Sequence, residues 1–260
     1  MKKSELRRAL TATVRAARAA GKLMRQNLHL TKRVNLATSH DIKLELDERC
    51  QKLIERTLHN AFPEVAVLGE EGVSGAADAD ERWVVDPIDG TVNFAYEIPH
   101  AAVSIALQAR TGSNYETVLG VIYDPFQDEL WTAIKGGTAR CNGRVIRVSR
   151  RAKASEAIVA IGFAKSKDNL RKSLPYFGKL ARRVRKVRIM GSAALSLTYV
   201  AMGRFDAYVE RGISLWDIAA GGLIVECAGG EFWREPITGH YRYRMVASNG
   251  RVGKSLAKPD

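Results

Sequence analysis

The sequence predicts a fold of mixed α and β structure in which the two halves of the chain differ in their pattern. In residues 1–145, two long stretches with helical periodicity accompany short apolar runs separated by turn residues, which is typical of an antiparallel sheet covered by two helices. In residues 146–260, strand-like and helical stretches alternate, which favours an α/β layer. At 260 residues, the two halves can share one compact unit.

The first half begins with amphipathic helices. Residues 4–28 carry apolar side chains at alternating spacings of three and four, with Arg and Lys on the opposite face. An Arg-rich start could also be a transit peptide, but Glu5 breaks the acid-poor composition of such peptides, so we favour a structural helix. After a polar connection over residues 35–40, helical spacing resumes at Leu46 and continues to about Phe62.

The strands of the first half are short, apolar and bounded by turn residues. We expect them at residues 65–68, 83–85, 101–109, 118–123 and 130–134, with a surface loop over 75–80. Pro87 has no N–H to donate, so the strand over 83–85 should stop before it and leave Asp86 at a strand end.

The second half alternates between the two kinds of element. We expect strands at residues 158–161, 187–190 and 205–209, and helices at about 168–184, 191–202 and 216–228. Asp217 lies in the first turn of the last helix, where the helix dipole favours a carboxylate. Small residues follow it at 219–222, and these would allow another element to pack unusually close.

Residues 83–99 contain the densest group of potential metal ligands and hydrogen-bonding groups in the sequence. Within six residues it brings two carboxylates, Asp86 and Asp89, together with the Ile88 carbonyl and the Thr91 hydroxyl. Hard cations such as Mg²⁺ are bound by oxygen ligands of this kind, with waters and substrate phosphate completing the coordination. The same residues could instead form an Asp-Pro turn followed by a helix cap. Taken alone, the stretch leaves both interpretations open.

Other acidic residues could belong to the same site if a metal binds nearby. Asp47 begins the second helix, where it is either a capping carboxylate or a side chain that points inward at the Thr91 hydroxyl. Glu70 and Glu71 follow an apolar strand and would usually form a solvated loop. Beside a metal site, one of them would point inward and the other outward.

The composition excludes several classes of protein. The hydrophobic fraction is 46%, and no apolar run approaches the ~20 residues of a membrane-spanning helix. Cys50, Cys141 and Cys227 are scattered, which predicts neither a disulfide framework nor a zinc site and favours a reducing, cytoplasmic location. The net charge of +13 is compatible with a polyanionic partner, an acidic small substrate or a solvated surface.

Three stretches together resemble the inositol monophosphatase family, and its bacterial members most closely. They are Gly-Glu-Glu at 69–71, Trp-Val-Val-Asp-Pro-Ile-Asp-Gly-Thr-Val-Asn-Phe at 83–94, and Trp-Asp-Ile-Ala-Ala-Gly-Gly-Leu-Ile-Val-Glu-Cys-Ala-Gly-Gly at 216–230. Further similarity at 99–106 and 191–197 extends the match over nearly the whole chain. The resemblance implies the five-layered αβαβα sandwich of the inositol monophosphatase and fructose-1,6-bisphosphatase type. It also implies Mg²⁺-dependent hydrolysis of a phosphate monoester, and a homodimer.

The resemblance also implies specific site residues. The implied ligands of two to three Mg²⁺ ions are Glu70, Asp86, the Ile88 carbonyl, Asp89 and Asp217. The implied catalytic residues, which would orient or deprotonate the attacking water, are Glu70, Thr91 and Asp47. The implied substrate contacts are Gly90, Thr91, Gly191, Ser192, Ala193, Glu210 and Asp217. Two departures, Leu44 in place of a common threonine and Val92 in place of Thr or Ser, affect the surroundings of Asp47 and the substrate preference.

The resemblance leaves more than one function open. Inositol 1-phosphate is the expected substrate, with other sugar or polyol phosphates tolerated, and histidinol phosphate is the competing substrate. Glu210 would contact ring hydroxyls, or would be an ordinary acid at a strand end. A protein that binds RNA or the transcription machinery through its basic surface is the alternative from another class. The densest basic run is Arg182, Arg183, Arg185, Lys186 and Arg188, and it could equally be a solvated face.

Overall fold

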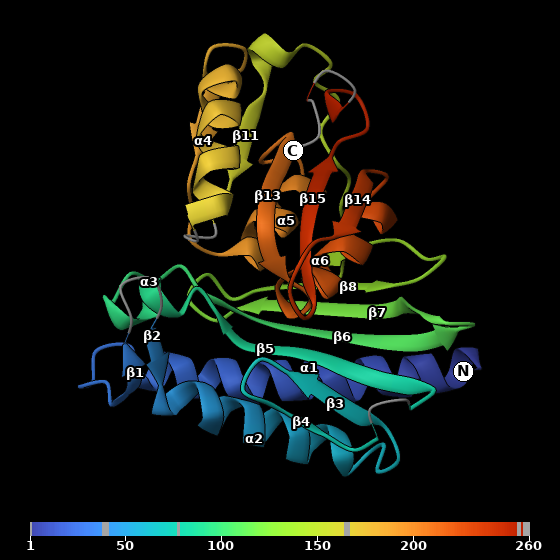
Figure 1. The fold of residues 1–260 in the computed structure, drawn as a ribbon. Helices are drawn as coiled ribbons and strands as arrows, with labels where there is room; N and C mark the ends of the chain where they lie inside the picture. Colours follow the sequence, from blue (N-terminus) through green and yellow to red (C-terminus); the bar gives the residue numbers. More distant parts are fainter. Residues whose placement is uncertain (1, 38–41, 77–78, 164–166, 254–255, 257–260) are drawn as a thin grey trace.

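The computed structural model describes residues 2–37, 42–76, 79–163, 167–253 and 256. Their helices and strands stack in five layers, with helices outside and between two sheets (Figure 1). The αβαβα sandwich implied by the resemblance is therefore confirmed.

The first layer consists of α1 (Lys3–Asn27) and α2 (Glu45–His59), which pack on the outer face of the large sheet. The buried face of α1 is made mostly of alanines, and this lets the helix lie close to the strands. The contact is tightest at Gly21, where a Cβ atom would lie 2.6 Å from the Tyr123 ring. Both helices agree with the predicted ranges to within a few residues at their ends.

The large sheet has the strand order β10-β9-β8-β7-β6-β5-β3-β4. Its strands are β3 (Ala66–Gly69), β4 (Gly72–Ser74), β5 (Glu81–Asp89), β6 (Ala102–Thr111), β7 (Asn114–Asp124), β8 (Glu129–Ile134), β9 (Arg140–Cys141) and β10 (Arg144–Val145). The pairing of β3 with β5 is parallel, and the other pairings are antiparallel. The prediction covered the five longer apolar strands but not β4, β9 and β10, which are two or three residues long.

The prediction that Pro87 ends the central strand was wrong. Asp86 pairs with Ser104, and Asp89 pairs with Ala102. Between these two pairs the chain moves three residues along β5 but only two along β6. This extra residue is a β-bulge, and a bulge tolerates proline because one backbone N–H there needs no partner in the ladder. The strand therefore continues through the motif and ends at Asp89.

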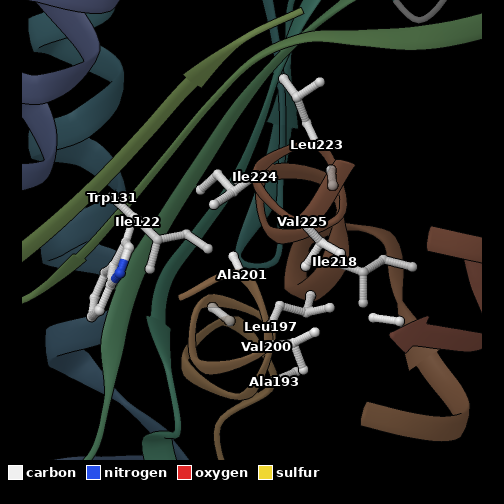
Figure 2. Close-up of a cluster of buried hydrophobic side chains, with 14 of the residues drawn as sticks. Ile122, Trp131, Ala193, Leu197, Val200, Ala201, Ile218, Leu223, Ile224 and Val225 are labelled. Carbon is white, nitrogen blue, oxygen red and sulfur yellow. The ribbon is translucent and has the colours of Figure 1, made fainter. Parts of the chain in front are cut away.

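The middle layer consists of α5 (Ala193–Ala201) and α6 (Leu215–Cys227), which lie between the two sheets. Figure 2 shows their side chains meeting Ile122 and Trp131 of the large sheet in the central core. The predicted close packing of the small residues behind Asp217 is confirmed. A Cβ atom at Gly120 of β7 would lie 2.7 Å from the Ala220 carbonyl oxygen, and one at Gly221 would lie 2.5 Å from Leu197.

The second sheet has the order β12-β11-β13-β15-β14 and is covered on its outer face by α4 (Lys167–Ala181). Its strands are β11 (Ile158–Ile161), β12 (Lys186–Arg188), β13 (Ala207–Ser214), β14 (Glu231–Pro236) and β15 (Arg242–Ser248). The first three strands pair in parallel, as an α/β layer requires, while β15 and β14 add an antiparallel hairpin that we did not predict.

Short elements complete the described chain. The strands β1 (Val34–Ala37) and β2 (Ile42–Leu44) pair where a polar connection was predicted, so that prediction was wrong for residues 35–37, and residues 38–40 lie outside the described ranges. Of the loop predicted over 75–80, residues 77–78 also lie outside them. The remaining elements are α3 (Thr91–Ala95) and a 3₁₀ turn over Ala154–Glu156. Every helix in the described ranges is too short or too polar to cross a bilayer.

Candidate active site

A cleft of about 410 Å³ opens where the end of β5 meets the first turns of α5 and α6. It brings together every residue for which the sequence implied metal or substrate binding. These residues are Glu70, Asp86, Ile88, Asp89, Gly90, Thr91, Gly191, Ser192, Ala193, Glu210 and Asp217. Asp47, by contrast, is not among the described residues that line the cleft.

Three aspartates form the acidic cluster of this cleft: Asp86, Asp89 and Asp217. One carboxylate oxygen from each lies within 4.8 Å of the corresponding oxygens of the other two. Asp86 and Asp89 come from β5, on either side of its bulge, while Asp217 comes from the first turn of α6. The bulge is what brings both β5 carboxylates into the cluster, because residues three apart on a regular strand face opposite sides of the sheet.

Backbone donors at the ends of three elements hold these carboxylates. The Ile88 N–H donates to Asp86 Oδ1 at 3.0 Å, and the Ser214 N–H donates to Asp217 Oδ2 at 3.0 Å. Asp89 accepts hydrogen bonds from the start of α5. Its donors are the Ser192 hydroxyl at 2.5 Å and the backbone N–H groups of Ala193 at 3.2 Å and Ala194 at 2.6 Å. A proposed metal ligand and two proposed substrate residues are therefore in direct contact.

The crowding of carboxylates changes their ionisation. Burial raises the pKa of Asp86 well above its usual range, and the charges of Glu70 and of the rest of the acidic cluster raise it further. Burial and the charge of Asp217 raise the pKa of Asp89 to about 7, although its hydrogen bonds to α5 act in the opposite direction. Closely spaced, buried, oxygen-only donors of this kind fit a hard divalent cation, whose charge would offset their mutual repulsion.

The two adjacent glutamates point to different sides, as expected beside such a site. Glu70 lines the cleft, and its N–H donates to the Val85 carbonyl at 3.1 Å, which joins the end of β3 to β5. Glu71 instead forms an ion pair with Lys43 at 3.2 Å, and its N–H donates to the Gln51 side chain at 2.9 Å. Gln51 of α2 thus helps to fix the direction of this loop.

Thr91 and Asp47 have separate hydrogen-bond partners. The Thr91 hydroxyl donates to the Ile88 carbonyl at 2.8 Å. Asp47 is 2% exposed and accepts from the Leu44 N–H at 2.7 Å, which caps the start of α2. This contact agrees with the capping interpretation of Asp47. It also uses only the backbone of Leu44, so the replacement of the family's threonine there leaves the cap intact.

The turn after β5 is tied to the loop before α5. Gly90 has φ of +102°, and a Cβ atom there would lie 2.9 Å from the His100 carbonyl oxygen and 3.2 Å from that of Gly191. The Asn93 side-chain amide donates to the carbonyls of His100 and Met190, each at 2.9 Å. Sequence reasoning missed this role of Asn93, and the only signal for it was its place within the motif.

The side of the cleft formed by β13 carries Glu210. Burial raises the pKa of Glu210 to about 8, although a hydrogen bond from the Tyr208 hydroxyl lowers it. Sequence reasoning named Glu210 but missed Tyr208, which also lines the cleft. The period of two along a strand could have indicated it, because residues two apart share one face of the sheet.

The chain is similar to known proteins in both sequence and structure. The model of the inositol monophosphatase family matches residues 5–251. A Nus factor SuhB of Pseudomonas aeruginosa is 38% identical over 259 residues, which cover 95% of this chain and 93% of the relative. An inositol-1-monophosphatase of Rhizobium meliloti is 39% identical over 256 residues, with 95% and 94% covered. The crystal structure of the extragenic suppressor protein suhB from Bartonella henselae has a TM-score of 0.87 at 34% identity, with 95% of this chain and 96% of that chain covered.

Proposed function

The chain belongs to the inositol monophosphatase family and is a phosphoric monoester hydrolase, and we propose that it hydrolyses inositol 1-phosphate to inositol and phosphate in the presence of Mg²⁺. The observation that carries this proposal is the position of Glu210 in the same cleft as the acidic cluster. The cluster suits a phosphate with its metal ions, while a carboxylate at the β13 side suits the hydroxyl groups of a polyol leaving group.

We assign the metal ligands from the donor set of the cleft. They are Glu70, Asp86, the Ile88 carbonyl, Asp89 and Asp217, for two to three Mg²⁺ ions. When bound, such ions offset the charge of the phosphate and lower the pKa of a coordinated water. The chain's own contribution is to hold these oxygens in place through the backbone hydrogen bonds of β5, α5 and α6.

The remaining site residues are assigned to the water and the phosphate. We propose that Thr91 and Glu70 orient the attacking water, that the Glu70 carboxylate accepts its proton, and that the N–H groups of Gly90 and Thr91 bind phosphate oxygens. Asp47 is not among the described residues that line the cleft, so we propose that it supports the reaction through the start of α2, which it caps.

The leaving group is assigned to the opposite side of the cleft. We propose that Gly191, Ser192, Ala193 and Glu210 contact its hydroxyl groups, with Asp217 between the two sides. The same carboxylate could pair with the amino group of histidinol phosphate, so this ester remains the alternative substrate. Hydrolysis of other sugar or polyol phosphates is also consistent with a cleft of about 410 Å³.

The deciding experiment compares kcat/KM for inositol 1-phosphate and histidinol phosphate, measured as phosphate release with Mg²⁺ and with EDTA. We expect release that depends on Mg²⁺ and a preference for the inositol ester. Asp86→Asn should abolish turnover while the circular dichroism spectrum is unchanged. Preference for histidinol phosphate would overturn the substrate, and turnover in EDTA would overturn the metal assignment.

A second candidate function is binding to RNA or to the transcription machinery. Two observations favour it: SuhB relatives carry the name Nus factor, and the basic run is exposed over the end of α4 and the edge strand β12. Among the described residues, its members form no ion pair with a carboxylate; they are Arg182, Arg183, Arg185, Lys186 and Arg188. RNA binding that weakens steeply with salt in the wild type, and is lost in an all-alanine variant of this run, would support the role; no binding at physiological salt would refute it.

We also propose a cytoplasmic homodimer. Val92 and Ile189 line the cleft and are exposed, and Tyr96 and Ile98, which follow α3 directly, are exposed too, with Tyr96 at 71%. Exposed apolar side chains this close together are typical of interfaces. The three cysteines are free thiols, which is consistent with a reducing compartment. Sedimentation of the wild type and of Tyr96→Glu tests the dimer, and a monomeric wild type at all concentrations would refute it.

A further inference from the structure

Glu210 is held by a neighbour on its own strand. Tyr208 and Glu210 both belong to β13 and face the same side of the sheet, since they are two residues apart. The Tyr208 hydroxyl donates a hydrogen bond to Glu210 Oε2. Tyr208 is only 3% exposed and packs in the central core, so its hydroxyl has a fixed position. The hydrogen bond therefore restricts the rotamers of Glu210.

Gly162, which lies just after the neighbouring strand β11, has no side chain and so makes room for the Glu210 carboxylate. Gly162 follows β11, and its N–H donates to the Val209 carbonyl at 3.1 Å. A Cβ atom on Gly162 would lie 1.8 Å from Glu210 Oε2 and 2.3 Å from Glu210 Cδ. The φ angle of Gly162 is not in the left-handed region, so its backbone does not require glycine. What requires glycine here is the space that Glu210 occupies.

These contacts leave one oxygen of Glu210 for a ligand. Oε2 is engaged by Tyr208, while Oε1 makes no hydrogen bond within the described residues. The carboxylate lines the cleft that contains the acidic cluster, so it can accept a hydrogen bond from a group attached to a phosphate held there.

We propose that Tyr208 and Gly162 are positioning residues for Glu210, and that this trio selects esters whose leaving group carries hydroxyl groups. The inference rests on the proposed function, because it assumes that the phosphate binds at the acidic cluster. It goes further by naming the residues that give Glu210 its selectivity. Neither residue touches the reacting atoms, so their loss should change the choice of substrate and leave the chemical step intact.

The test compares two esters that differ in their leaving groups. The first is inositol 1-phosphate, and the second is phenyl phosphate, whose leaving group has no further hydroxyl to offer. We expect Tyr208→Phe to raise KM for the inositol ester about tenfold and to leave kcat and KM for phenyl phosphate unchanged, because a hydrogen bond that orients a carboxylate is lost. Gly162→Ala should produce the same pattern by displacing the Glu210 side chain.

Two controls separate positioning from folding. Tyr176→Phe also removes a buried hydroxyl, one with no hydrogen-bond partner among the described residues and outside the cleft, and it should alter neither ester. Glu210→Gln should reproduce the Tyr208→Phe pattern. Adding Tyr208→Phe to Glu210→Gln should then cause little further change, because both substitutions disrupt one arrangement.

The outcomes distinguish this inference from the proposed function. Equal losses on both esters in Tyr208→Phe would mean a general structural role and would overturn the inference, as would unchanged kinetics on both. If the wild type hydrolysed neither ester, the proposed function and the selection of esters would both fail, and a double-mutant cycle on the thermal unfolding midpoint would still decide whether Tyr208 positions Glu210. Additive shifts for Tyr208→Phe and Glu210→Gln in that cycle would overturn it, and non-additive shifts would support the coupling.

Discussion

The Ser192 hydroxyl donates a hydrogen bond of 2.5 Å to Asp89 Oδ2, across 103 residues of sequence and between the two halves of the fold. The same hydroxyl oxygen accepts from the Leu195 N–H at 3.3 Å and so caps α5. One side chain thus begins a helix and orients a carboxylate of the acidic cluster.

Ser192→Ala should therefore lower the free energy of unfolding by about 1–2 kcal/mol, because a helix cap and a hydrogen bond to a buried carboxylate are both lost. Ser192→Thr retains the hydroxyl and should recover most of this free energy. Urea unfolding at neutral pH measures both variants. Equal stability of the alanine and threonine variants would contradict the role given to the hydroxyl.

The adjacent acids of the β3 loop provide a matched pair of substitutions. Glu70→Gln should reduce kcat at least about 100-fold, because it removes a carboxylate that faces the cleft and the developing charge of the reaction. Glu71→Gln removes an equal charge one residue away, at an ion pair with Lys43, and should change kcat less than about twofold. Comparable losses in both variants would show that the loop as a whole, and not Glu70, supports the reaction.

His100 should make the protein less stable in mild acid. Its Nε2 atom is buried without a hydrogen-bond partner among the described residues, and burial lowers the pKa of the imidazole below the 6.5 of an exposed histidine. As the pH falls below about 6.5, this side chain takes up a proton in the unfolded chain before it does so in the folded protein, so the contribution of His100 to the free energy of unfolding decreases.

Urea unfolding of the wild type and of His100→Gln at about pH 7.5 and about pH 5.5 isolates this contribution: on acidification the wild type should lose more stability, or gain less, than the variant, because the buried acids with raised pKa values act in the opposite direction in both proteins. An unchanged pH dependence in the variant would rule out His100 as its source.

Gly120 should be intolerant of a side chain. A Cβ atom there would lie 2.7 Å from the Ala220 carbonyl oxygen, and backbone of α6 cannot move away as a flexible side chain could. Gly120→Ala should cost about 1–3 kcal/mol of stability. Gly178→Ala is the control, since no atom lies within 4 Å of its Cβ position in α4, and it should be neutral or stabilising by up to about 1 kcal/mol.

We propose further that residues 1–145 and 146–260 unfold as one unit, because α6 packs on both sheets. Wild type and Gly120→Ala should then each unfold in a single transition that is the same by fluorescence and by circular dichroism. Two separate transitions in the wild type would refute this.

The sequence by itself determined the elements and the acidic residues of the site. Periodicity identified the long helices and the apolar strands, because burial of one face leaves a regular pattern of side chains. The resemblance of its motifs to those of the inositol monophosphatase family implied Asp86, Asp89 and Asp217, which the cleft brings together. The sequence did not reveal the half-buried hairpin of β14 and β15, whose burial follows from pairing with β13.

Only the tertiary structure decided how these residues contact one another. Pro87 was predicted to end its strand, but β5 continues past it because its pairing with β6 contains a β-bulge there. The bulge brings the side chains of Asp86 and Asp89 to the same side. No sequence pattern marks Gly162, whose missing side chain leaves the space that Glu210 occupies. Local patterns record which face of an element is buried, whereas a contact between residues far apart in sequence depends on the packing of the layers that carry them.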